Sequence, residues 1–157
     1  MNLIGWRRPE QGAVAVEFAL IVPIFCLLLF GIIQYSLYFW STQSAADAAR
    51  EGARRGAVGQ TCTDLTTLTR SLVKLAQVAP TVTRKYYAAT DTTFATPITL
   101  STANATDANV RITLSYPSSN LNLPFIPFPH GGTVSEVSVA RVESFSTTSP
   151  TKWVQCP

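Results

Sequence analysis

The sequence predicts an α+β fold in which a long N-terminal helix, transmembrane at first and then a stalk, carries a small domain. Three observations predict this architecture. An apolar run occupies residues 13–33 and is broken only by Glu17. An alanine-rich segment without proline follows it as far as Ala57. The remaining residues, 58–157, contain one segment with helical periodicity and several with strand alternation, which indicates one amphipathic helix and an antiparallel sheet of about three or four strands.

The composition narrows the class of protein. Of the 157 residues, 46% are hydrophobic and only 13% are charged, which favours a membrane-anchored protein over a disordered one. The formal net charge is +3, and the basic residues are scattered along the chain. Nucleic-acid binding is therefore excluded, because it requires a concentrated basic surface.

The apolar run is long enough to span a bilayer. A helix rises ~1.5 Å per residue and the hydrocarbon core is ~30 Å thick, so about 20 apolar residues suffice. The core helix of a soluble protein seldom stays apolar on all sides for so long. A cleaved secretory signal, with Arg7 and Arg8 before the run and an A-x-A site at Ala46 and Ala48, fits less well because Ala48 lies far beyond the run.

Glu17 is the one acidic residue in this run, and it needs a partner. A carboxylate at mid-membrane costs about 2.5 to 3.5 kcal/mol on insertion scales. If the chain were cut after Gly12, the new α-amino group of Ala13 would lie one helical turn from Glu17 on the same face, or it could face Glu17 of a neighbouring chain. Such an amine would be the cation that the Glu17 carboxylate lacks, so Glu17 is a candidate functional residue.

The order of these residues resembles the type IV pilin superfamily. A short basic leader ends in Gly12, a small residue follows, Glu17 is fifth in the cleaved chain, and the apolar helix continues directly. The longer string VEFALIVPIFCLLLFGIIQYSLYF, followed by SAADAAREGAR, resembles the TadE-like pseudopilins of tight-adherence (Tad, type IVc) pilus systems. The similarity is close through about Ala57. Beyond it, only the VRITLSY run, a proline-rich hydrophobic loop and a terminal ARVE segment are similar.

The resemblance implies a structural subunit, a minor pilin or pseudopilin used to assemble an adhesive pilus, and no enzymatic activity. It implies that a prepilin peptidase removes residues 1–12 by cutting between Gly12 and Ala13. The partners would be other pilin or pseudopilin subunits and the pilus assembly platform, and Glu17 would set the register between subunits. The chain would cross the bacterial inner membrane once, with its C-terminal domain extracytoplasmic. A second hypothesis stays open: a single-pass, membrane-anchored binding module that does not polymerise.

Orientation in the membrane depends mainly on the leader. Arg7 and Arg8 favour a cytoplasmic N-terminus under the positive-inside rule. Arg50, Arg54 and Arg55 lie near the other end of the span, so the charge count alone barely decides.

The predicted stalk, residues 34–57, carries a stripe of small residues. They recur at helical spacing in two adjacent rows, Ala45, Ala49, Ala53 and Ala57 beside Ala48, Gly52 and Gly56. Such a stripe lets another backbone approach closely. The partner could be the chain's own domain or a neighbouring pilin helix. Gly56 and Gly59 are the expected helix stops.

The domain is predicted to begin with an amphipathic helix at residues 64–78, capped by Thr63 or Asp64 and closed by Pro80. Strands are predicted at residues 82–87, 96–100, 109–116 and 134–145. The alternation of the last strand slips between Val137 and Ala140, which indicates a bulge or an edge. Residues 118–132 form a loop because prolines interrupt them. We expect this apolar loop to lie against the domain or, alternatively, to dock another subunit.

Cysteine and histidine usage favours a structural role. Cys62 and Cys156 flank the domain, and outside the cytoplasm a disulfide between them is favoured over two free thiols. Cys26 lies within the apolar run, and no function is assigned to it. His130, the single histidine, has no nearby partner at triad or metal-ligand spacing. We therefore predict no catalytic residue, metal, cofactor or small-molecule substrate, and we treat the glycosylation pattern at residues 104–106 as chance.

Overall fold

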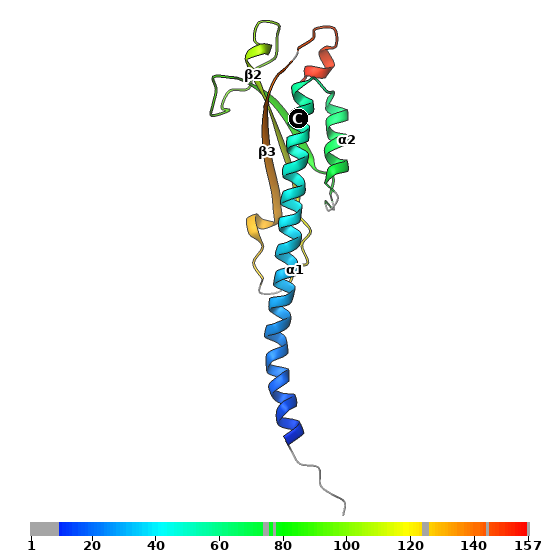
Figure 1. The fold of residues 1–157 in the computed structure, drawn as a ribbon, viewed down its shortest axis with the longest axis vertical. Helices are drawn as coiled ribbons and strands as arrows, with labels where there is room; N and C mark the ends of the chain where they lie inside the picture. Colours follow the sequence, from blue (N-terminus) through cyan, green and yellow to red (C-terminus); the bar gives the residue numbers. More distant parts are fainter. Residues whose placement is uncertain (1–9, 74–75, 77, 124–125, 144, 157) are drawn as a thin grey trace, which may run out of the picture.

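The computed structural model describes residues 10–73, 76, 78–123, 126–143 and 145–156. The chain forms one very long helix, α1 (Glu10–Ala57), with a small α+β domain packed beside its C-terminal part (Figure 1). This confirms the predicted fold class. At ~1.5 Å per residue, the 48 residues of α1 extend for about 70 Å, far beyond one bilayer thickness. Most of the predicted leader lies outside the described residues, and its last residues, from Glu10, begin α1.

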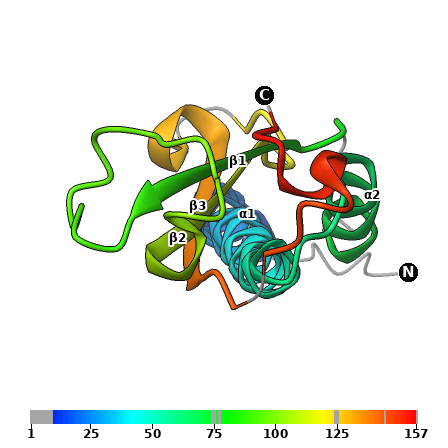
Figure 2. The same ribbon diagram turned by 90° about the horizontal axis from the view of Figure 1, so that it is seen from above.

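The sheet has three antiparallel strands in the order β1 (Thr81–Ala88), β2 (Ala108–Pro117) and β3 (Thr133–Arg141). One face packs on α1, and α2 (Cys62–Leu72) lies beside α1 (Figure 2). The alternation of β2 explains this packing, because every second residue is fully buried: Val110, Ile112, Leu114 and Tyr116. The predicted strands at residues 82–87 and 109–116 are therefore confirmed to within one residue at each end.

Helix α2 begins earlier and ends earlier than predicted. Its N-cap is Thr61, not Thr63 or Asp64, and the Thr61 hydroxyl accepts a hydrogen bond from the Asp64 amide at 3.2 Å. The predicted end near residue 78 is wrong. The helix stops at Leu72 because Val73 turns into the core, and the Ser44 hydroxyl of α1 donates to the Leu72 carbonyl at the end of the helix.

The strand predicted at residues 96–100 is also wrong. Only one bridge forms there, in which the Ile98 amide donates to the Tyr86 carbonyl at 2.8 Å. Pro97 has no N–H to extend a ladder. The Asp91 carboxylate accepts hydrogen bonds from the backbone amides of Thr93, Ala95 and Thr96, which holds residues 91–96 in a compact turn.

The last strand ends at Arg141, short of the predicted residue 145, and it pairs with β2 without a bulge from Thr133 to Arg141. The alternation slips because β3 lies at the edge of the sheet. Glu136 and Ser138 are half-buried and directly opposite Leu114 and Ile112, whereas Val137 and Val139 lie on the outer face and are exposed.

The C-terminus of α1 depends on only one of the two predicted glycine stops. Gly59 has a φ of +78°, which glycine adopts without strain, and it follows directly after the last turn. Gly56 is helical and buried instead. A Cβ at Gly56 would lie 3.2 Å from Val110 Cγ2, so this glycine permits the close approach of β2 and does not end the helix.

Candidate functional site

The N-terminal half of α1, residues 12–33, is uncovered except beside Gly31, where Ile126 approaches it. Large apolar side chains point outward on every side, with exposures such as 63% for Val16, 68% for Phe18 and 66% for Ile24. This is the one described helix that is long and apolar enough to cross a membrane. It gives the protein a single-pass anchor, because so much apolar surface is unfavourable in water.

The predicted processing and register residues lie at the start of this half. Gly12, Ala13 and Glu17 are all exposed, and the peptide bond between Gly12 and Ala13 is helical in the full-length chain. Within the described residues, no cation pairs with the Glu17 carboxylate.

The C-terminal half of α1, residues 34–57, is covered by the chain's own domain. The predicted packing residues Ala45, Ala49 and Ala53 are at most 1% exposed. A Cβ on Gly52 would stand 3.3 Å from Thr69 Cγ2 of α2 and 3.4 Å from Ile112 Cγ2 of β2. Of the two partners left open by the sequence, the small-residue stripe thus contacts the domain of the same chain.

The junction between the two halves is held by hydrogen bonds from α1 to residues 118–132, which we call the junction loop. The Gln34 amide nitrogen donates to the Ser119 carbonyl at 3.3 Å, and its oxygen accepts the Leu121 amide at 2.9 Å. The Tyr35 hydroxyl donates to the Pro127 carbonyl at 2.9 Å. The described part of this loop therefore lies against α1 of the same chain, whereas the first expectation placed it against the domain, and docking of another subunit stays a prediction.

Sequence reasoning missed Gln34. A polar residue directly after an apolar run reads as the first exposed position of the stalk, yet Gln34 is only 2% exposed. Its two loop partners are more than 80 positions away in sequence, so no local pattern could identify them.

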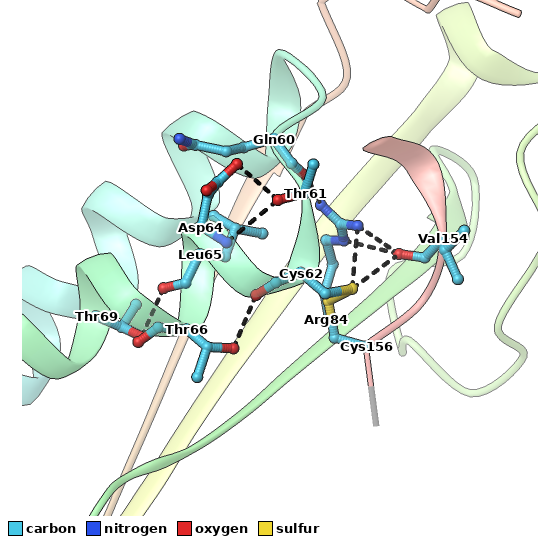
Figure 3. Close-up of a disulfide and its surroundings, with 10 residues drawn as sticks. All are labelled: Gln60, Thr61, Cys62, Asp64, Leu65, Thr66, Thr69, Arg84, Val154 and Cys156. Atoms are coloured by element: carbon cyan, nitrogen blue, oxygen red, sulfur yellow. Dashed lines mark hydrogen bonds between the residues drawn. A yellow bond between two sulfur atoms is a disulfide. The ribbon is translucent and has the colours of Figure 1, made fainter. Parts of the chain in front are cut away.

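A disulfide joins the start of α2 to the C-terminal segment. Cys62 and Cys156 are bonded with an S–S distance of 2.08 Å and a Cα–Cα distance of 5.7 Å (Figure 3). Main-chain hydrogen bonds in both directions between Arg84 and Cys156 add the segment to the edge of β1. The third cysteine, Cys26, is a free, partly buried thiol in the apolar half of α1.

Arg84 lies beside this disulfide and was not anticipated from the sequence. Its side chain is fully buried, and its guanidinium donates to the carbonyls of Val154 and Gln60 (Figure 3). Burial lowers the pKa of Arg84 from its ordinary value. Arg84 thereby connects β1 to the C-terminal segment and to the link between α1 and α2. The only signal for this role in the sequence is that Arg84 lies between Val82 and Tyr86 on the inward face of β1.

The exposed side of the stalk carries its charges. Glu51 pairs with Arg54 at 2.9 Å and with Arg55 at 2.7 Å. Hydrogen bonds from these two guanidinium groups, Arg54 first, lower the pKa of the Glu51 carboxyl to about 2. The C-terminal half of α1 thus has a buried face of small residues and an outer face with charged residues.

Among the described residues, no group of three His, Cys, Asp or Glu side chains is arranged to hold a metal ion. His130 lies in a short 3-10 helix, η2 (Pro129–Gly132), at the end of the junction loop. The largest exposed apolar surface of the described chain is the uncovered half of α1.

Comparison with known proteins identifies the same helix. Residues 12–54 match the family model described as TadE-like protein. This confirms the resemblance drawn from the sequence over both halves of α1, and with the single apolar span it supports a pilin-like protein associated with the Tad system. No curated protein and no solved structure matches the chain.

Proposed function

We propose that this protein is a TadE-like minor pilin or pseudopilin, a structural subunit for the assembly of a Tad-type (type IVc) pilus used in adherence. It is inserted once in the inner membrane, with the domain outside the cytoplasm, and a prepilin peptidase cuts it between Gly12 and Ala13. One observation carries the proposal: α1 is divided into an uncovered apolar half and a half covered by its own domain.

Two environments in turn can cover the apolar surface of the uncovered half. In the bilayer, acyl chains surround it. In a pilus, the same side chains pack against the helices of other subunits, so the apolar surface stays out of water when the assembly machinery extracts the subunit. The stalk cannot provide this surface, because its small-residue face is already buried against β2 and α2.

Glu17 supports the assembly role. With Ala13 at the membrane surface, Glu17 lies only ~6 Å deeper, since a helix rises ~1.5 Å per residue. A single subunit therefore tolerates the carboxylate in the bilayer. In the assembly, the α-amino group of Ala13 from the same or a neighbouring chain pairs with it and fixes the register.

The processing step is tested by replacing the residue before the cut. Gly12→Leu should leave full-length precursor in the membrane, because a bulky side chain is expected to block the peptidase. Gly5→Leu, in the same leader but away from the cut, should be processed normally. N-terminal sequencing of the membrane forms reads both results. Normal processing of Gly12→Leu would contradict the proposal, and a mature N-terminus at Met1 in the unaltered protein would favour the anchored binding module that does not polymerise.

A further inference from the structure

The junction loop reaches past the domain toward the membrane-spanning half of α1. After β2 it runs along the helix in the direction of the N-terminus (Figure 1). Its first contact is Ser119 with Gln34, and farther along it Pro127 contacts Tyr35. A Cβ placed on Gly31 would lie 3.7 Å from Ile126 Cδ1. This is an ordinary van der Waals distance, so the Ile126 side chain lies directly beside the helix at Gly31.

The depth of this contact follows from the position of Gln34, the first strongly polar residue after the apolar run. Gly31 precedes it by about one helical turn, which is ~4.5 Å along the axis. Ile126 therefore lies at a level where amphipathic elements normally enter the boundary of headgroups and acyl chains, about 5–10 Å deep. Phe39 and Trp40 are both more than 60% exposed and lie ~12–14 Å farther along the helix than Gly31, on the side away from the span, as interfacial aromatic residues do.

An open apolar groove lies where the loop meets the helix. Its volume is about 490 Å³, and its walls are Leu27, Leu28 and Ile32 of the apolar run together with Phe39, Ile126 and Pro127. Because part of the lining belongs to the membrane span, the groove is continuous with a surface that lipid already covers. Before assembly, while α1 is in the bilayer, lipid and not a second chain is therefore the expected occupant of this groove.

The chemistry of the loop fits lipid. Between Arg111 and Glu136 the sequence has no Lys, Arg, Asp or Glu, so insertion requires no charged side chain to lose its hydration. Three prolines at positions 124, 127 and 129 lack an N–H, which reduces the number of backbone donors that need a partner near the hydrocarbon. The contact therefore depends on apolar partitioning and not on anionic headgroups.

From these observations we propose that the junction loop is a membrane-surface contact, in which phospholipid acyl chains fill the groove between Ile126 and α1. The loop docks the domain on the outer surface of the bilayer that holds α1, so the domain does not swing freely on its stalk. The inference rests on the membrane anchor in the proposed function, and its test separates the two.

The test uses the full chain with Cys26→Ser, reconstituted in phosphatidylcholine vesicles with the Cys62–Cys156 disulfide oxidised. An environment-sensitive fluorophore is attached at Ile126→Cys, and quenching is measured with lipids that carry a nitroxide near the glycerol or near the chain end. Leu121→Cys, which is 46% exposed in the same loop, gives a second position that does not disturb the Ile126 contact. Val139→Cys, 40% exposed on the outer face of the sheet, is the matched control.

We expect several-fold stronger quenching at Ile126 than at Val139, with the shallow nitroxide more effective, and an intermediate result at Leu121. Quenching at Ile126 and Leu121 no greater than at Val139 would overturn the inference. A signal at Ile126 that changes with the protein-to-lipid ratio would assign the groove to a second copy and would also overturn it. A probe at Ile24→Cys must be quenched by the deep nitroxide, and its failure would contradict the membrane anchor itself.

Discussion

The two halves of α1 belong to one uninterrupted helix, but the chain's own domain covers only the C-terminal half. Residues 12–33 carry large apolar side chains on all sides and contact almost nothing in the chain. Residues 34–57 carry alanine and glycine on one side, buried against the sheet and α2, and charges on the other. The difference shows that side-chain size decides the partner. Small residues let the chain's own domain approach closely, and large residues leave the other half of the helix exposed.

The largest effect on stability is expected from removing the disulfide of the domain. Replacing Cys62 and Cys156 by serine should lower the free energy of unfolding of the domain by about 2–5 kcal/mol, because the disulfide closes a loop of 94 residues. Cys26→Ser is the matched control and should change the domain little. Urea unfolding in detergent, followed by near-ultraviolet circular dichroism, measures both. If the domain lost no stability, its integrity would not depend on this link.

A smaller effect on stability is expected from a larger side chain on the buried face of the covered half. Gly52→Leu should lower the stability of the domain by about 1–3 kcal/mol or more, because the added side chain meets Thr69 and Ile112. Ala19→Leu, which also replaces a small residue of α1 by leucine but on the uncovered half, should leave the stability of the domain unchanged. Thermal unfolding of the two variants compares them, and equal transitions would break the distinction between the halves.

The sequence predicted the parts of the fold that depend on local pattern. The apolar run and the alternation of β2 both follow from neighbouring residues. The partner of the small-residue stripe could not be predicted, because Gly52 meets Ile112 some 60 positions away. Residues 96–100 alternate too weakly to form a strand, and Pro97 limits them to one bridge.

The same limit applies to the candidate site. Glu17 stands out because an acidic residue in an apolar run violates a local rule, whereas Gly12 and Ala13 are assigned by the resemblance to pilin leaders, and all three roles stay predictions. Gln34 and Arg84 do not stand out, since a polar residue at the end of a span or on a strand is ordinary. Only their long-range carbonyl and amide partners give them a role.

The smallest expected effect concerns the charged face of the stalk. The pKa of Glu51 is lowered to about 2, so its ionised form stabilises the folded state. That contribution is fully present above the ordinary pKa of 4.5 and is lost as the pH falls through about 2. Wild type should therefore exceed Glu51→Gln slightly in melting temperature above pH 4.5, and the difference should vanish near pH 2. An unchanged difference across this range would show that the ion pairs contribute nothing, and the effect is small because exposed pairs are weak.

The most direct test of the central claim asks whether the uncovered half of α1 finds its partner in other subunits through Glu17. Glu17→Ala should still insert and be cleaved, and it should accumulate as processed membrane protein that neither crosslinks to other pilins nor supports pilus formation. Asp47→Ala, which removes an exposed carboxylate from the covered half, should assemble normally. Crosslinking to neighbouring subunits and counts of surface pili decide between the outcomes. If Glu17→Ala matched the unaltered protein in both, Glu17 would have no role in register, and the account of the uncovered half as an assembly surface would lose its specific contact.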